Sequence, residues 1–275
     1  ATMDDDEPIY RRLYRDINDN RKYPPDIWIE KHKIDRINTD RRYHISPPDV
    51  STRYVITEHY RPEMNEVDTV MELINNTNDG DILVFQAGTG DIAKTIKALN
   101  KVLPQSVIAI PYHAQLSPSY KLFIEKIDKN KDKIKIDKQV FEITGITTDE
   151  DLQKGKYIYH RVVLVSTNIS EASITFDSVK HVVDTGVEKN SNYDYERRSG
   201  VLRQTYITEA SRLQRRGRIG RTSAGDAYFL YKKNSLLNNK KQFNIATSDL
   251  HQDVMLDYMY TVNDSKFPII IDIIN

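Results

Sequence analysis

The 275-residue chain contains no cysteine, which excludes disulfide bonds, thiolate metal sites and a cysteine nucleophile. Its seven histidines form no HxxxH or HExxH pair, so the histidine pattern gives little support to a metal site. No apolar run approaches the ~20 residues of a membrane-spanning helix, and no secretory signal stands at the start. We therefore expect a soluble, intracellular protein with no membrane partner.

The chain also lacks an excess of either charge, because Lys+Arg and Asp+Glu both number 40. This balance argues against a generally basic surface that coats nucleic acid. A site for a polyanion must then be a local cluster of positive charge. The densest cluster is SRLQRRGRIGR, from Ser211 to Arg221, with five arginines and two glycines.

Two interpretations of this basic segment are open: a phosphate site, or the solvated face of a surface helix. Arginine keeps its charge, and its planar fork matches phosphate oxygens in pairs. If the segment is helical, Gln214, Arg218 and Arg221 share one face at i, i+4 and i+7. The two glycines cost a helix about 1 kcal/mol each, which suggests that a ligand or backbone approaches there. A structural alternative for Gln214 is a helix-start capping box with Ser211.

Short apolar runs alternate with helical periodicity along the chain. Strands are expected at 51–60, 82–85, 106–114, 161–168, 179–186 and 226–231. Helices are expected at 64–75, 91–102 and 117–127, and the lysine-rich segment 128–138 is expected to be a solvated connector. This alternation predicts an α/β fold with a mostly parallel sheet and helices on both faces. Ligands of such sheets bind beyond the carboxyl ends of the strands.

Several of the expected strands end in glycine or short polar residues, as at 87–90, Thr167-Asn168 and 184–186. The chain contains no GxxxxGK[ST] phosphate loop, and the turn 88–90 lacks the required lysine. We therefore expect 88–90 to be a tight strand-to-helix connection. No DExH or DExD string follows an apolar strand either. If the chain serves an NTPase, the groups that bind magnesium and activate water must lie in another domain.

Several segments together resemble one family. RLQRRGRIGR is similar to motif VI, QRxGRxGR, of superfamily-2 DExH-box helicases, and STNISEASITFDSVKHVVDTG is similar to their motif V. DILVFQAGTGDI is similar to their motif IV strand and turn, and Ala1-Thr2-Met3 resembles the end of motif III. The motifs stand in the family's order over about residues 44–260. The pattern is most like that of RNA helicases of large DNA viruses, of the poxviral nucleoside-triphosphatase-II and DEAH type.

The resemblance implies a RecA-like second helicase domain at 44–235. Residues 1–43 would then end the first RecA-like domain and connect the two, with a motif III remnant at 1–3. Residues 236–275 would form a C-terminal extension that leads to a following domain. A β-hairpin is implied between motifs V and VI, with Ser199-Gly200 as its turn. The resemblance also implies a viral protein, in the virion or the host cytoplasm.

In this family ATP or another NTP and Mg²⁺ lie between two RecA-like domains and are bound mainly by the first, which this chain lacks. The resemblance makes Arg218 and Arg221 the arginine fingers, and it places Gln214 at the γ-phosphate or the attacking water. Asp177 and Gly186 are implied on the nucleotide side, although each also fits an ordinary turn. We expect the chain alone to hydrolyse no NTP.

RNA, as a single strand with adjacent duplex, is the partner that the resemblance implies. The residues implied at RNA are Thr167, Asn168, His113, Ser117, Arg197 and Arg198, with Arg203 on the same hairpin. Bland alternatives remain: His113 as a surface histidine, Ser170 as a helix cap, and the hairpin as ordinary exposed structure. Phe123 fits either the core or a stacking role near the base. Arg215 is expected to pair with a neighbour, and Arg216 to do the same or to face solvent.

The full-length protein would couple NTP hydrolysis to 3′→5′ translocation and RNA unwinding, a direction taken from the family. One rival is a DNA-directed superfamily-2 translocase, because the motifs do not settle ribose contacts. Another rival is a non-catalytic RNA-binding module that keeps the fold. Gln214, Arg218 and Arg221 argue against this second rival, since a scaffold has no need of arginines at a γ-phosphate.

Overall fold

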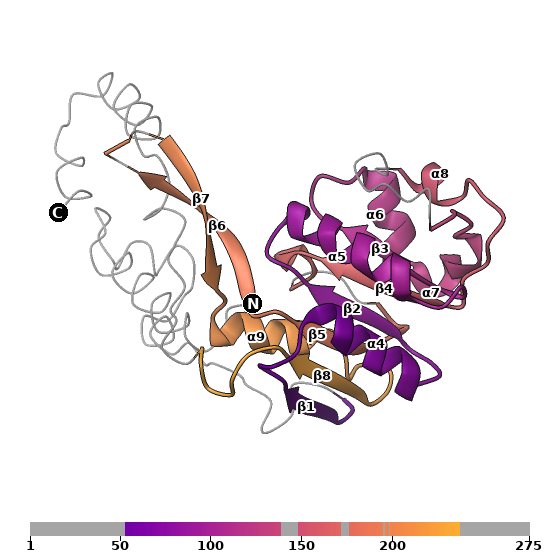
Figure 1. The fold of residues 1–275 in the computed structure, drawn as a ribbon, viewed down its shortest axis with the longest axis horizontal. Coiled ribbons are helices and arrows are strands. Elements are labelled where there is room, and N and C mark those ends of the chain that lie inside the picture. Colours follow the sequence, from indigo (N-terminus) through magenta and orange to yellow (C-terminus); the bar gives the residue numbers. More distant parts are fainter. Residues whose placement is uncertain (1–52, 139–147, 172–175, 195, 198, 237–275) are drawn as a thin grey trace, which may run out of the picture.

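A six-stranded sheet forms the centre of the computed structural model, which describes residues 53–138, 148–171, 176–194, 196–197 and 199–236 (Figure 1). The strand order is β1-β8-β5-β2-β4-β3, and every neighbouring pair is parallel. The strands are β1 Ile56–Tyr60, β2 Asp81–Phe85, β3 Val107–Tyr112, β4 Arg161–Ser166, β5 Val179–Asp184 and β8 Gly225–Phe229. The predicted mostly parallel sheet is confirmed.

Helices cover both faces of this sheet. They are α4 Glu66–Asn76, α5 Thr89–Val102, α6 Pro118–Glu125, α7 Ile127–Asn130, α8 Asp149–Leu152 and α9 Glu209–Arg216, with 3₁₀ turns η1 Lys131–Lys133 and η3 Asn168–Glu171. The crossovers through α4 and α5 step across the sheet in one direction, and the later ones step back. Because such crossovers are right-handed, α4 and α5 lie on one face and α6, η3 and α9 on the other.

The core explains why the strands were visible in the sequence. All residues of β2, β3 and β4 are buried, as expected for strands that are covered on both faces. Helix α4 begins at its N-cap Asn65, whose side chain accepts a hydrogen bond from the Asp68 amide, and it buries Val70 and Leu73. Among the described helices, none has the length and apolar character that crossing a membrane demands.

The expected solvated connector at 128–138 is wrong in part, because this segment packs into the core. Ile134 and Ile136 are buried, and the Tyr159 hydroxyl donates to the Ile136 carbonyl at 2.6 Å. Lys131 Nζ lies 2.7 Å from Oδ1 of Asp81, a side chain with no exposed surface. The lysine-rich composition concealed two buried isoleucines and one lysine that neutralises a buried carboxylate.

A hairpin stands apart from the six-stranded sheet, as the resemblance implied (Figure 1). It consists of β6 Val187–Asp194 and β7 Ser199–Tyr206 in antiparallel register. The predicted Ser199-Gly200 turn is wrong, because these residues already pair with Asp194 and Tyr193 in the ladder. The Asp194 carboxylate accepts hydrogen bonds from the amides of residues 196 and 197, and this side chain sets the turn earlier.

The predicted boundaries at 43/44 and 235/236 stay predictions. Residues 1–52, including the motif III remnant, and 237–275 lie outside the described residues.

Replacing Asp81 tests the buried ion pair at the amino ends of the strands. Asp81→Ala removes the partner of Lys131 and of the Val162 amide, which donates to Asp81 Oδ1 at 2.8 Å. We expect the free energy of unfolding, measured by urea denaturation, to fall by about 3 kcal/mol. Asp79→Ala is the matched control, because the Asp79 side chain is 76% exposed in its pair with Lys180, and its effect should stay within about 0.5 kcal/mol. Equal losses in the two variants would contradict this account.

Candidate functional site

Helix α9 carries the first part of the arginine-rich segment, up to Arg216, and its N-cap lies three residues before the expected cap at Ser211. Thr208 is the N-cap, and its hydroxyl accepts from the Ser211 amide at 3.1 Å. The Ser211 hydroxyl donates instead to Glu171 at 3.2 Å. The capping-box alternative for Ser211 and Gln214 is therefore wrong, since a threonine with the right backbone geometry precedes them.

The helix ends at Arg216, so the expected continuous helical face of Gln214, Arg218 and Arg221 is also wrong. Gly217 is the C-cap, and Gly220 has φ +74°, a left-handed conformation that favours glycine. The chain turns after α9, and the Gly220 carbonyl accepts from the Tyr54 amide at 2.9 Å. Gly220 thus serves to turn the backbone, whereas the φ of −69° at Gly217 is one that any residue adopts.

Gln214, Arg218 and Arg221 nevertheless lie near one another, because hydrogen bonds across the turn link them. Arg218 Nε donates to the Gln214 carbonyl at 3.2 Å, and Arg221 Nε donates to the Gly217 carbonyl at 2.9 Å. All three side chains are partly buried. Burial, and then the charge of Arg221, lower the pKa of Arg218 to about 10, while Glu171 opposes the change. The pair of arginines is thus a concentration of positive charge in a partly desolvated place.

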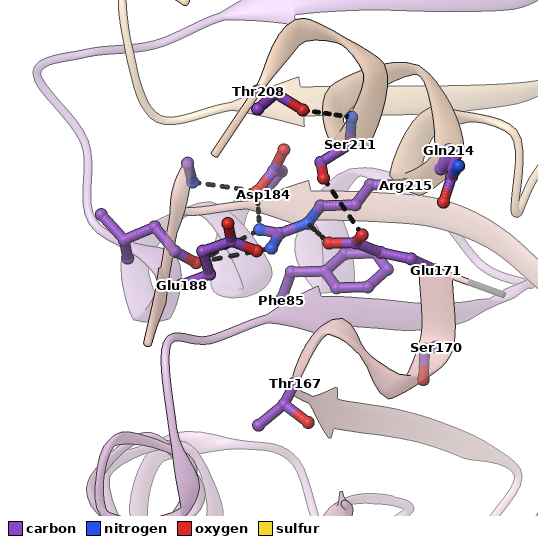
Figure 2. Close-up of polar contacts among 12 residues, drawn as sticks. Phe85, Thr167, Ser170, Glu171, Asp184, Glu188, Thr208, Ser211, Gln214 and Arg215 are labelled. Atoms are coloured by element: carbon purple, nitrogen blue, oxygen red, sulfur yellow. Dashed lines mark hydrogen bonds and ion pairs between the residues drawn. The ribbon is translucent and has the colours of Figure 1, made fainter. Parts of the chain in front are cut away.

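Arg215 points the opposite way, into the domain (Figure 2). Its side chain is fully buried, with Nε 2.7 Å from Glu171 and Nη1 2.8 Å from Asp184. The guanidinium also lies 4.9 Å from the centroid of the Phe85 ring. The expectation that Arg215 pairs with neighbours is confirmed. Arg216 pairs too, with its Nε 2.6 Å from Glu58 on β1.

Two further groups complete this buried network. The Tyr231 hydroxyl donates to the second oxygen of Asp184 at 2.8 Å, and the Gly186 amide donates to the first at 2.9 Å. Burial raises the pKa of Tyr231, and the charge of Asp184 raises it further. Burial also raises the pKa of Glu171, although Arg215 opposes that shift. Tyr231 was not among the predicted site residues, because in sequence it only ends the apolar run 226–231; in the structure it lies two residues beyond β8.

The loop after β4 holds Thr167 and Asn168. Thr167 is partly buried and Asn168 is exposed at the start of η3. Ser170 has no exposed surface, and its hydroxyl lies 2.6 Å from the Ser166 hydroxyl. Ser170 therefore fastens η3 to β4, and the alternative of a cap on a following helix stays a prediction, because residues 172–175 lie outside the described residues.

Other candidates follow the same edge, because the carboxyl ends of parallel strands lie together. His113 follows β3 and is partly buried, and burial and then Lys121 lower its pKa below the usual 6.5. The Ser117 hydroxyl caps α6 by accepting from the Tyr120 amide at 3.1 Å. Phe123 belongs to the buried core, so the core interpretation of Phe123 is confirmed.

The two nucleotide-side candidates lie at opposite ends of β5, a strand of six residues that is about 20 Å long. Asp177 precedes the strand, is exposed, and its carbonyl accepts from Thr222, the neighbour of Arg221, at 3.0 Å. Gly186 follows the strand with φ +75°, and a Cβ there would lie 2.4 Å from the Tyr231 ring. The structure groups Asp177, but not Gly186, with the arginine pair.

The hairpin arginines are exposed: Arg197 lies in its turn and Arg203 on β7. Arg198 lies outside the described residues. The described residues contain no group of three or more His, Asp or Glu side chains that could hold a metal ion.

Known protein families and individual proteins resemble this chain. Residues 65–223 match the family model described as "Helicase conserved C-terminal domain". The chain is 41% identical, over 97% of its length, to "Putative ATP-dependent RNA helicase R366" of Acanthamoeba polyphaga mimivirus. It is 29% identical, over 77% of its length, to "ATP-dependent RNA helicase HrpA" of Escherichia coli.

A solved structure of similar fold is the Escherichia coli DEAH/RHA helicase HrpB, with a TM-score of 0.57 and 21% identity over 77% of this chain. The chain spans 16% of the mimivirus protein, 15% of HrpA and 24% of the HrpB chain. The RecA-like fold that the motifs implied is thereby confirmed.

Replacing Arg215 tests the buried network. Arg215→Met leaves the carboxylates of Glu171 and Asp184 buried without their cation, so we expect the free energy of unfolding at pH 7 to fall by about 3–5 kcal/mol. Without Arg215 the raised pKa of Glu171 should rise further. A carboxyl whose pKa is higher in the folded state costs stability only above its unfolded pKa. The deficit should therefore shrink as the pH is lowered towards 4.5.

Arg216→Met is the matched control in the same urea titrations. Its partner Glu58 keeps a second arginine, Arg212, at 3.2 Å, so we expect a loss of about 1 kcal/mol or less. A deficit in Arg215→Met that is small, or constant from pH 7 to 4.5, would refute the assignment.

Proposed function

Because the chain belongs to the helicase conserved C-terminal domain family, we propose that it is the second RecA-like domain of an NTP-dependent RNA helicase. In this role it supplies arginines to the γ-phosphate of an NTP and part of the track for single-stranded RNA. The observation that carries the proposal is the partly buried pair Arg218 and Arg221, oriented by backbone carbonyls just beyond α9.

A phosphate group suits this pair on electrostatic grounds. Burial, and then the charge of Arg221, disfavour the charged form of Arg218 and lower its pKa to about 10. An anion between the two guanidinium groups removes that repulsion. Phosphoryl transfer is governed by positioning and charge stabilisation, and an arginine finger contributes about 10³–10⁵ in rate. Arg218 and Arg221 are the proposed fingers, with Gln214 at the γ-phosphate or the attacking water.

The rest of the nucleotide site would lie on a first RecA-like domain, which binds the NTP phosphates and Mg²⁺. Asp177 is the residue proposed to contribute from this side, and its support is that its backbone carbonyl accepts a hydrogen bond from Thr222, next to Arg221. Gly186, at the other end of β5, is left out of the proposed nucleotide set. On this proposal the 275-residue chain alone hydrolyses no NTP.

The RNA track is proposed along the carboxyl ends of the strands. Thr167, Asn168 and His113 gather at that edge with the cap residue Ser117, and short polar side chains and backbone amides there suit phosphate oxygens. Arg197 and Arg203 extend the positive charge along the hairpin, and Arg198 stays an RNA candidate from the resemblance alone. The printed names of the relatives, which are RNA helicases, support RNA over DNA as the nucleic acid.

Replacing Arg218 tests the finger assignment in the full-length protein. Arg218→Ala should lower RNA-stimulated NTP turnover by about 10³-fold or more, because the transition-state charge loses its partner. The dissociation constant for NTP should change by less than about threefold, since the other domain binds the phosphates. Arg203→Ala is the matched arginine control and should keep normal turnover at saturating RNA. Normal turnover in Arg218→Ala would remove the assignment.

Replacing Arg203 tests the RNA track by its salt dependence. Arg203→Ala should weaken binding of single-stranded RNA whatever its sequence, because the side chain contacts phosphate. The slope of log K against log[salt] should become shallower by about 0.7 for one lost phosphate contact. The exposed Lys97 on α5 supplies the control Lys97→Ala, which should leave affinity and slope unchanged. An unchanged slope in Arg203→Ala, or equal binding of single-stranded DNA, would count against the RNA track.

A further inference from the structure

The hairpin needs something to fix its direction. Strands β6 and β7 form a separate two-stranded sheet, and most of their residues are half-exposed or exposed. A lone two-stranded hairpin is only marginally stable in water. Its orientation must therefore be set where it meets the domain.

The root of the hairpin provides one attachment. The Ile207 amide donates to the Gly186 carbonyl at 3.0 Å, and Arg215 Nη1 donates weakly to the Val187 carbonyl at 3.4 Å. Both contacts lie at the first and last residues of the hairpin. A hairpin that is attached only at this end can still swing about the attachment, and Gly186 lies next to that point.

A second attachment lies farther along β6. Lys189 Nζ is 2.7 Å from Asp91 Oδ2, and the two side chains are 30% and 29% exposed. Asp91 stands in the first turn of α5, which begins at Thr89 after the short connection 86–88 that follows β2. This ion pair therefore joins the hairpin to the carboxyl-end edge of the sheet.

Gly88 makes room for this contact. Its φ of −164° and ψ of 175° are extended values that any residue adopts, so its conformation does not require glycine. A Cβ on Gly88 would lie 2.9 Å from both Cδ and Nζ of Lys189. The space that a side chain would take is filled by the lysine on its way to Asp91.

We propose that Lys189, Asp91 and Gly88 form a latch that holds the hairpin β6–β7 at a fixed position over the connection 86–88 between β2 and α5. In the proposed helicase function, on which this role rests, the three are positioning residues for separating a duplex. Releasing the latch leaves the nucleotide groups beyond α9 in place. It changes only the position of the hairpin relative to the nucleic-acid strand that the hairpin contacts.

The distance between two spin labels tests the latch and does not require an enzymatic assay. The chain has no cysteine, so Glu196→Cys at the hairpin turn and Lys97→Cys on α5 give two spin-label sites in the 275-residue chain. Lys189→Met should broaden the distance distribution between the labels. Gly88→Ala should broaden it as well, although it changes no charge, because its methyl group displaces the lysine. Unchanged distributions in both variants would overturn the latch.

A matched control exists at the opposite end of the sheet. Lys180 pairs with Asp79 at 2.6 Å and passes over a glycine, Gly80, whose added Cβ would lie 2.7 Å from the Lys180 Cβ. Lys180→Met removes the same kind of contact without touching the hairpin. Its distance distribution should match that of the parent chain, and equal broadening in this control would also overturn the latch.

Activity of the full-length protein gives the second readout. Lys189→Met and Asp91→Asn should each lower the RNA unwound per NTP hydrolysed by about two- to twentyfold. NTP turnover should stay within about twofold of the parent, a split that general damage to the fold does not produce. The double variant should be no worse than the worse single variant, because both remove one contact. Normal unwinding, or losses that add up in the double variant, would overturn the proposal.

The two readouts separate this inference from the proposed function. If the full-length protein hydrolyses no NTP and unwinds nothing, the proposed function fails. The label distances still decide whether the latch holds the hairpin.

Discussion

The ion pairs of Arg215 hold together the segments on which the candidate site depends. One guanidinium contacts Glu171 from η3 and Asp184 from the end of β5, while it belongs to the last turn of α9. A fully buried arginine is costly to desolvate, and here two carboxylates and the Phe85 ring offset that cost. The loop after β4, the end of β5 and the arginine-rich helix therefore cannot shift independently.

The buried Arg215 also lies between two surfaces of the domain, one with the proposed phosphate contacts and one with the proposed RNA contacts. Arg215 points inward, whereas its neighbours Gln214 and Arg218 lie where α9 ends and the chain turns. At the carboxyl end of β5, Asp184 and the Val187 carbonyl bring the hairpin root against Arg215. The proposed phosphate contacts and the proposed RNA contacts thus lie at opposite ends of β5. One buried cation lies between them and fixes the geometry of both.

Apolar runs and helical periodicity predicted the sheet and the covering helices, because they report local burial directly, whereas the hairpin was implied by the resemblance to the helicase family. It also singled out Gln214, Arg218 and Arg221 as a group. It missed the end of α9 because an i, i+4, i+7 spacing does not reveal that Gly220 adopts a positive φ. It missed the pair of Lys189 and Asp91 because the two residues are 98 positions apart and join only in the folded chain. The buried isoleucines at 134 and 136 were hidden by lysines that surround them in sequence.

In the proposed complex, Arg218 and Arg221 contact the terminal phosphate of an NTP that is bound to another domain. The most direct measurement is an experimental structure of the full-length protein with a non-hydrolysable NTP analogue and Mg²⁺. The account predicts guanidinium nitrogens of both arginines about 3 Å from γ-phosphate oxygens. A closed complex in which the γ-phosphate is contacted by other residues, with Arg218 and Arg221 turned away, would contradict it.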